Sequence, residues 1–304
     1  MASKKNAQNK ALKKQTAARK QGGMTTVVPA AGLVVPVLLF LVIQLVTTLV
    51  VAFMAGEGWI PDEQMGGIAT AASALINLIA LAVIDRKMGL GTLTRESVLG
   101  RLDCAPPARG RSRQRSEVRM SAAAGACVIC VLLAVCLNIL LNGLVLMTGI
   151  QNIDPLFKSA QASFAEGSLP VQILAYGILV PIAEEWLFRG FVYRFFEDRF
   201  HGNEGFHALA IVLTSLTFAV YHGNLTQGIY VFFLGIFLCL AVDRGGLLCA
   251  VIIHLGVNLT SLIGNQIPSY RDILTHPAAH WPYILAAAVI GEGLFLLLGR
   301  VTEP

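Results

Sequence analysis

The sequence predicts an all-α polytopic membrane protein with about eight transmembrane helices. Hydrophobic residues make up 55% of the chain and charged residues only 13%. The mean hydropathy of +0.67 is well above the balance of an ordinary soluble domain. Eight apolar segments, each near the roughly 20 residues needed to cross the hydrocarbon, account for this bias. We expect spans at residues 28–54, 66–84, 121–149, 170–196, 206–222, 226–242, 247–264 and 281–299.

Lys and Arg residues are concentrated in the segments on one side of the predicted spans. Residues 1–25 are predicted to be a disordered basic tail, whose Lys and Arg residues are Lys4, Lys5, Lys10, Lys13, Lys14, Arg19 and Lys20. A second basic group lies between the second and third spans and contains Arg86, Lys87, Arg95, Arg101, Arg109, Arg111, Arg113, Arg115 and Arg119. Because Lys and Arg collect in cytoplasmic loops, this segregation predicts a topology signal rather than a nucleic-acid partner. If the eight spans alternate from a cytoplasmic N-terminus, only Lys158 and Arg271 fall on the opposite side.

This pattern predicts an integral multi-pass protein with both termini cytoplasmic, in the cell membrane if the source is bacterial. Residues 85–119, rich in Arg, Ser and Gly with a Pro106-Pro107 pair, are predicted to form a basic cytoplasmic loop. The loop divides a two-helix membrane part, 26–84, from a six-helix body, 120–304. Five cysteines lie within apolar spans, where we expect small packing groups rather than a disulfide framework.

Ionisable side chains within the spans are confined to the later helices. The fourth span carries Glu184, Glu185 and Arg189, the fifth ends at His222, and the seventh contains His254. Such groups cost several kcal/mol inside a bilayer unless they are paired or wetted, so they are functional candidates. Glu292 of the eighth span is also intramembrane by this topology, and it is expected to pair with another helix or to line a water path.

Three pairs of residues are spaced four apart and therefore share a helical face: Glu185 with Arg189, Phe218 with His222, and His254 with Asn258. One interpretation is a structural ion-pair cluster that clamps neighbouring helices. The other is chemistry, because a carboxylate beside an imidazole can hold a water and take its proton, while an imidazole and a carboxamide can donate to an oxyanion. Counted along the helices, Glu184 and His254 fall near mid-membrane while His222 falls toward an outer end, which implies a tilted pocket or a deeper fifth helix.

A serine nucleophile is not supported, because no Gly-x-Ser-x-Gly elbow is present. A divalent metal, with zinc as the candidate, stays open although His-Glu-x-x-His is absent. If a metal is present, its predicted ligands are Glu184, His222 and His254.

The motifs Glu-Glu-x-x-x-Arg at 184–189, Phe-x-x-x-His at 218–222 and His-x-x-x-Asn at 254–258 resemble those of the CPBP family. This family comprises the CAAX proteases and bacteriocin-processing enzymes, also called the Abi family, and includes the type II CAAX prenyl endopeptidases. The resemblance covers about residues 165–265. It implies an intramembrane endopeptidase, either glutamate-dependent or a metalloprotease, that cuts a membrane-associated, prenylated or leader-peptide substrate.

The resemblance also implies a role for each motif residue. Glu184 is the implied base that activates water together with His222, and Glu185 pairs with Arg189 and shapes the pocket. His254 and Asn258 form the implied oxyanion site. The competing interpretation, from a different functional class, is a non-catalytic membrane partner or a transporter that uses the same charged cluster as an ion or substrate site.

Overall fold

The computed structural model describes residues 30–94, 98–99, 112–165, 167–200 and 204–302. All regular secondary structure within these ranges is helical, which confirms the predicted all-α class. The tail predicted for residues 1–25 lies outside the described residues, as does much of the loop predicted for 85–119.

Besides the 3₁₀ turns η1 (Asp62–Gln64) and η3 (Ile150–Asn152), the first half of the described chain contains five α-helices and one short π-helical segment. They are α2 (Ala31–Gly56), α3 (Met65–Met88), α5 (Ser112–Met147), α6 (Pro155–Ala165), α7 (Leu169–Gln172) and the π-helical η4 (Ile173–Leu179). The second half continues with α8 (Val180–Glu185), the π-helical η5 (Trp186–Tyr193), α9 (Arg194–Arg199), α10 (Glu204–Tyr221), α11 (Leu225–Gly245), α12 (Leu247–Gly264), α13 (Pro268–Thr275) and α14 (Trp281–Val301).

Seven stretches of these helices are long and apolar enough to cross a membrane: Gly32–Gly56, Asp62–Met88, Ala122–Met147, Leu169–Arg199, Leu225–Gly245, Leu247–Gly264 and Trp281–Val301. They match seven of the eight predicted spans. The predicted fifth span corresponds to a shorter apolar helix, Phe206–Tyr221. The chain is therefore a polytopic membrane protein, and α10 is too short to cross an average bilayer without local thinning of the bilayer.

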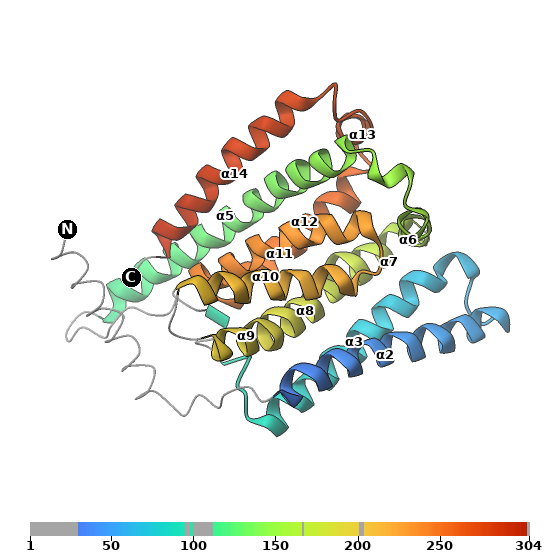
Figure 1. Cartoon of the computed structure of the whole chain (residues 1–304), viewed down its shortest axis with the longest axis horizontal. Coiled ribbons are helices and arrows are strands. Elements are labelled where there is room, and N and C mark those ends of the chain that lie inside the picture. The colour runs from blue at the N-terminus through green and yellow to red at the C-terminus, as the bar shows by residue number, and fades with distance from the viewer. Residues whose placement is uncertain (1–29, 95–97, 100–111, 166, 201–203, 303–304) are drawn as a thin grey trace.

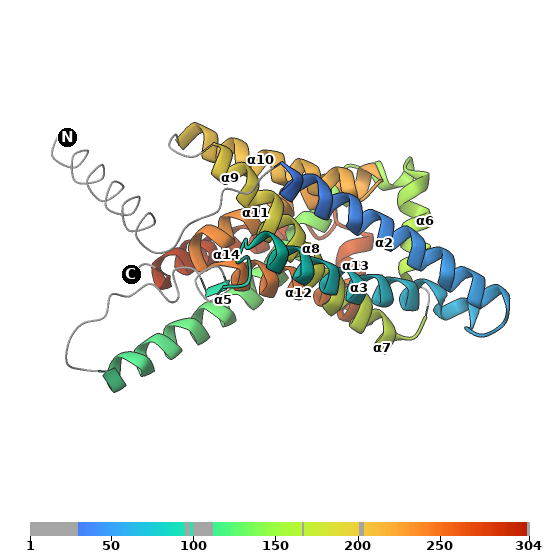
Figure 2. The same ribbon diagram turned by 90° about the horizontal axis from the view of Figure 1, so that it is seen from below.

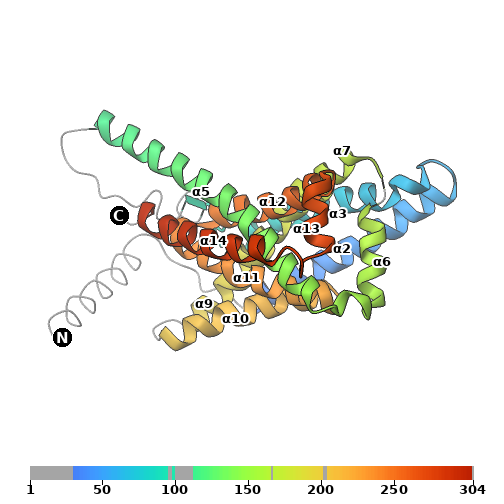
Figure 3. The ribbon, with the colours of Figure 1, turned by 90° about the horizontal axis from the view of Figure 1, so that it is seen from above.

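The bundle has two edges and two ends (Figure 1). The α2–α3 hairpin forms one edge and α14 forms the other, with α8, α10, α11 and α12 between them. We call one end the α9 end, because it contains α9, and the other the α6/α13 end. Figures 2 and 3 show α6 lying across the second end, while the first residues of α5 project from the α9 end. The helix α5 starts at Ser112, earlier than the span predicted from residue 121.

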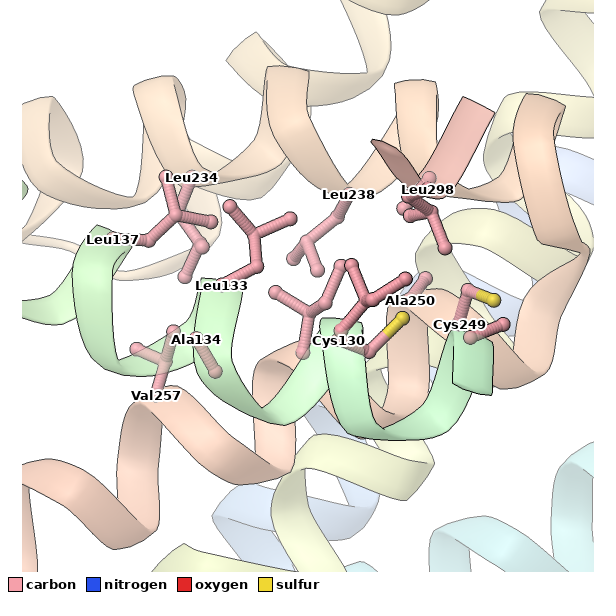
Figure 4. Packing of buried hydrophobic residues seen from close by; sticks show 14 of the residues in the cluster. Cys130, Leu133, Ala134, Leu137, Leu234, Leu238, Cys249, Ala250, Val257 and Leu298 are labelled. Carbon is pink, nitrogen blue, oxygen red and sulfur yellow. The ribbon is translucent and has the colours of Figure 1, made fainter. Parts of the chain in front are cut away.

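An apolar core joins α5, α11, α12 and α14 (Figure 4). Leu133 of α5 and Leu238 of α11 are fully buried in it, together with Cys130 and Cys249. The five cysteines of the described residues are all free. Burial of two of them among leucine and alanine side chains agrees with the expected packing role.

A second core surrounds the fourth span and is rich in aromatic rings. Phe188, Phe191 and Phe218 are its fully buried rings, and Phe40 of α2 and Leu81 of α3 complete it. The N-terminal hairpin therefore contributes packing to the helices that carry the ionisable residues.

The segment directly after α3 also packs against the fourth span, although it was predicted as part of a solvated loop. Thr92 is only 1% exposed. Its hydroxyl accepts a hydrogen bond from Trp186 Nε1 at 2.7 Å, and its N–H donates to Asp85 at 2.8 Å. The sequence does not predict this contact with the fourth span, because the residues around Thr92 show no apolar periodicity.

Candidate active site

The fourth span is not a uniform α-helix. Two π-helical segments, η4 and η5, flank the short α-helical turn that carries Glu184 and Glu185. Pro181 lies in this turn and has no N–H to donate to the helix. Insertions of π-helix are frequent at functional sites. Gly177 of η4 allows close approach to α12, because a Cβ at this position would lie 2.7 Å from a methyl of Leu259.

Glu185 is the centre of the ionic cluster. Its Oε1 accepts hydrogen bonds from Arg189 Nη1 and from His254 Nδ1, each at 2.8 Å. The pairing with Arg189 is the one that the spacing predicted. The contact with His254 was not predicted, so Glu185 belongs to the same group as the imidazole rather than to a separate structural half. Its second oxygen, Oε2, has no hydrogen-bond partner within the described residues.

Arg189 is 1% exposed and is held from three sides. Besides Glu185, its Nη2 donates to the carbonyl oxygen of Gly235 at 3.3 Å. The guanidinium also lies over the Phe218 ring, with its central carbon 4.7 Å from the ring centroid. These contacts compensate the loss of hydration that a fully buried cation otherwise suffers.

Glu184 is 5% exposed and faces the opposite ring nitrogen of His254. The distance between Glu184 Oε2 and His254 Nε2 is 3.8 Å, which is an ion-pair distance but too long for a hydrogen bond. His254 therefore lies between the two adjacent carboxylates of α8. Side chains that are distant in sequence meet here because α12 crosses the fourth span.

His222 follows the last residue of α10 and its ring turns back along the helix. Its Nδ1 donates to the carbonyl oxygen of Phe218 at 2.8 Å, which leaves Nε2 as an acceptor. Its ring packs edge-on against Phe218, and the His254 ring packs against the same phenyl group. Within the described residues no direct hydrogen bond or ion pair joins His222 to Glu184, so the predicted pairing of these two residues requires a bridging water or substrate.

Asn258 lies one helical turn beyond His254. Its Nδ2 donates to the carbonyl oxygen of Tyr176 in η4 at 2.8 Å. Sequence reasoning missed Tyr176 and Gly235, because both act through backbone carbonyls, which no residue type identifies. The structure thus brings together Glu184, Glu185, Arg189, His254 and Asn258, and places His222 beside them across Phe218.

The three predicted metal ligands do not form a metal-binding group. Within the described residues no three His, Cys, Asp or Glu side chains are arranged to share one ion. We therefore derive no step through a metal, and metal binding stays a prediction.

Glu292 lies outside this cluster. It is exposed at the surface of α14, beside a cavity of about 260 Å³ between α5, α11 and α14. It has no hydrogen bond or ion pair with another described residue.

The fold and this site define the class of the protein: an all-α, multi-pass membrane protein whose later helices enclose a cluster of Glu, Arg, His and Asn. Residues 166–260, about a third of the chain, match the family described as "Type II CAAX prenyl endopeptidase Rce1-like". This segment contains all three motifs, and the match confirms the predicted resemblance to the CPBP family. No curated protein and no solved structure matches the chain.

Proposed function

We propose that the protein is an intramembrane endopeptidase that hydrolyses a peptide bond of a membrane-anchored or lipidated substrate through Glu184, His222, His254 and Asn258. The position of His254 between Glu184 and Glu185 is the observation that carries this proposal. Two carboxylates, two imidazoles and a carboxamide from three helices meet at one place in a protein whose match is to a family of membrane endopeptidases.

The first step is activation of water. Glu184 takes a proton from a water held between its carboxylate and the free Nε2 of His222. The water oxygen then attacks the carbonyl carbon of the substrate peptide. As the C–N bond breaks, the proton passes from Glu184 to the leaving amine, so that Glu184 acts first as base and then as acid.

The second requirement is stabilisation of the oxyanion. Asn258 uses one N–H on the Tyr176 carbonyl and keeps a second for the substrate. The contact between His254 Nδ1 and Glu185 Oε1 orients the imidazole. Because Nδ1 already donates to Glu185, donation from Nε2 to the oxyanion requires the imidazolium form of His254.

The transporter alternative requires a polar path that continues to both ends of the bundle. Leu187, Phe188 and Phe191, which follow Glu185 toward the α9 end, are fully buried. This apolar layer beside the cluster favours a reaction site that is closed on one side.

The direct test is cleavage of a membrane-anchored fluorogenic peptide by purified protein in liposomes. Glu184→Ala is expected to lower turnover by about 10²- to 10⁴-fold, because the base is lost. Glu292→Gln is the matched control, since it changes an intramembrane carboxylate outside the cluster, and it should cleave at the wild-type rate. Turnover near the wild-type rate by Glu184→Ala protein that has the wild-type melting temperature would refute the mechanism.

The metal question has its own experiment. A glutamate-dependent enzyme should retain cleavage after incubation with a strong chelator and should purify without stoichiometric metal. Loss of cleavage with the chelator, restored by zinc, would instead identify a metalloprotease.

A further inference from the structure

The ionic cluster is closed on the side of the α9 end. Glu185 is 0% exposed and Arg189 is 1% exposed. Leu187, Phe188 and Phe191, which lie further along the fourth span, are completely buried. The fourth span continues from here through η5 to α9. Apolar packing thus covers the cluster on this side.

The opposite side of the cluster is open. Tyr176, His222 and Asn258 are partly exposed, unlike the residues on the closed side. Asn258 lies nearer than His254 to the C-terminal end of α12, and His222 follows the end of α10. Both helices end at the α6/α13 end of the bundle (Figure 1). The site is therefore reached from the α6/α13 end.

A groove lies at the same end of α10 and α11, although none of the site residues lines it. Its volume is about 670 Å³, and it lies between α10 and α11 with a mostly apolar lining. Val220, Gly223 and Asn224, which flank His222 in the chain, form part of its wall. An apolar groove beside a polar site fits a peptide whose anchoring portion stays in the bilayer.

The two ends of the bundle differ in basic residues. Among the described residues the α9 end carries Arg86, Lys87, Arg194, Arg199, Arg244 and Arg300. The α6/α13 end carries only Lys158 and Arg271, beside Glu57, Asp62, Glu63, Asp154 and Asp272. The basic tail of residues 1–25 precedes α2, which begins at the α9 end. By the positive-inside rule the α9 end is cytoplasmic.

We infer that the site opens to the extracytoplasmic side of the membrane. Resting on the proposed function, this makes the substrate a membrane-anchored peptide whose scissile bond lies at the outer leaflet. The excess of carboxylates over basic residues at this end of the bundle favours basic residues next to that bond. A lipidated C-terminus held on the cytoplasmic leaflet does not reach this opening.

The orientation is tested without any measurement of activity. The native Cys104 lies in the basic segment between α3 and α5, and Gln266 is exposed between α12 and α13. In intact spheroplasts a membrane-impermeant maleimide should label Cys104→Ser/Gln266→Cys protein. It should label Cys104 of the wild type only after the membrane is permeabilised. The reverse pattern, with Cys104 labelled in intact spheroplasts and Gln266→Cys protected, would overturn the inference.

The side of the membrane on which the substrate is cleaved is tested with spheroplasts and inverted vesicles, which expose opposite faces of the protein. A membrane-anchored peptide with basic flanking residues, added from outside, should be cleaved at least about tenfold faster by spheroplasts than by inverted vesicles. Glu184→Ala vesicles provide the background. Cleavage by inverted vesicles alone would refute the outer-leaflet substrate. Cleavage by neither, with the expected labelling pattern, would refute the proposed function while the orientation stands.

Discussion

The apolar core of α5, α11, α12 and α14 and the ionic cluster of the fourth span are built from different interactions although they share the helix α12. On one face of α12, Ile253 and Val257 pack into the apolar core with α5 and α11 (Figure 4). On the other face, His254 and Asn258 reach the ionic cluster of the fourth span. The apolar core holds α12 in place by close packing, and this placement brings His254 between the two carboxylates of the ionic cluster.

The difference has a physical reason. In a bilayer the lipid tails are as apolar as leucine, so packing of the first core is stabilised by dispersion rather than by exclusion of water. In the ionic cluster, which we also call the ionic core, each buried charge depends on its partners, because the surroundings offer no replacement for them. The loss of one partner should therefore cost more in the ionic core than the loss of one leucine in the apolar core.

The largest effect is expected for Glu185→Leu, which leaves Arg189 buried without its carboxylate and His254 without its hydrogen-bond acceptor. We expect a loss of about 3–5 kcal/mol in the free energy of unfolding. Denaturant unfolding in detergent micelles measures it. The double variant Glu185→Leu/Arg189→Met should recover much of the loss, because no unpaired charge is left. Glu292→Leu, at the surface of α14, should be no less stable than the wild type.

A smaller loss is expected for Leu133→Ala in the apolar core, where Leu133 is 1% exposed. The cavity should lower stability by about 2–3 kcal/mol, the low end of the range for buried leucines, because only packing is lost. Since Leu133 belongs to the apolar core and not to the ionic cluster, the kcat/KM of the folded protein should stay unchanged. A stability loss larger than that of Glu185→Leu would contradict the proposed difference between the cores.

Gly235→Ala changes the boundary between α10 and α11. The added Cβ would lie 3.0 Å from the side-chain atoms of Ser215 and 3.2 Å from its Cα, so the two helices must move apart. We expect a loss of about 1–2 kcal/mol together with lower activity, because the Gly235 carbonyl accepts from Arg189. Addition of Ser215→Gly should restore both, measured by unfolding and by peptide cleavage. Failure of this rescue would show that contact with Ser215 is not the cause.

The smallest effect concerns pH at the α6/α13 end. The Thr226 N–H, the Thr226 hydroxyl and the Phe157 N–H all donate to Asp154. These bonds, that of the Thr226 N–H foremost, hold the pKa of the Asp154 carboxyl below its usual range. The stabilisation is present above the unfolded pKa of about 3.9 and is lost as pH falls through the lower folded value. The stability of Asp154→Asn should therefore vary less with pH below about 4, measured by thermal unfolding across pH. An identical acid profile would exclude this role.

The part of the site that depends on spacing along one helix was predictable. Glu185 and Arg189 were expected to pair because they are four residues apart, and they do so at 2.8 Å. Glu184 and His222 were predicted to act together on one water, and this stays a prediction. No direct contact joins them among the described residues, and the distance between two helices is not encoded in the spacing within either. The π-helical segments of the fourth span were also not predicted, since their apolar pattern resembles that of an α-helix over so few turns.

By itself the sequence determined the all-α membrane class, the approximate spans and the residues of the ionic cluster, because hydrophobic length and intramembrane charge are properties of local composition. It also supplied the three motifs on which the family resemblance rests. Only the tertiary structure decided that His254 lies between Glu184 and Glu185, that Asn258 binds the Tyr176 carbonyl, and that the site opens at the end poor in basic residues. These features depend on how α12 crosses the fourth span and on where α10 ends. Both are decided by packing between helices that are distant in the sequence.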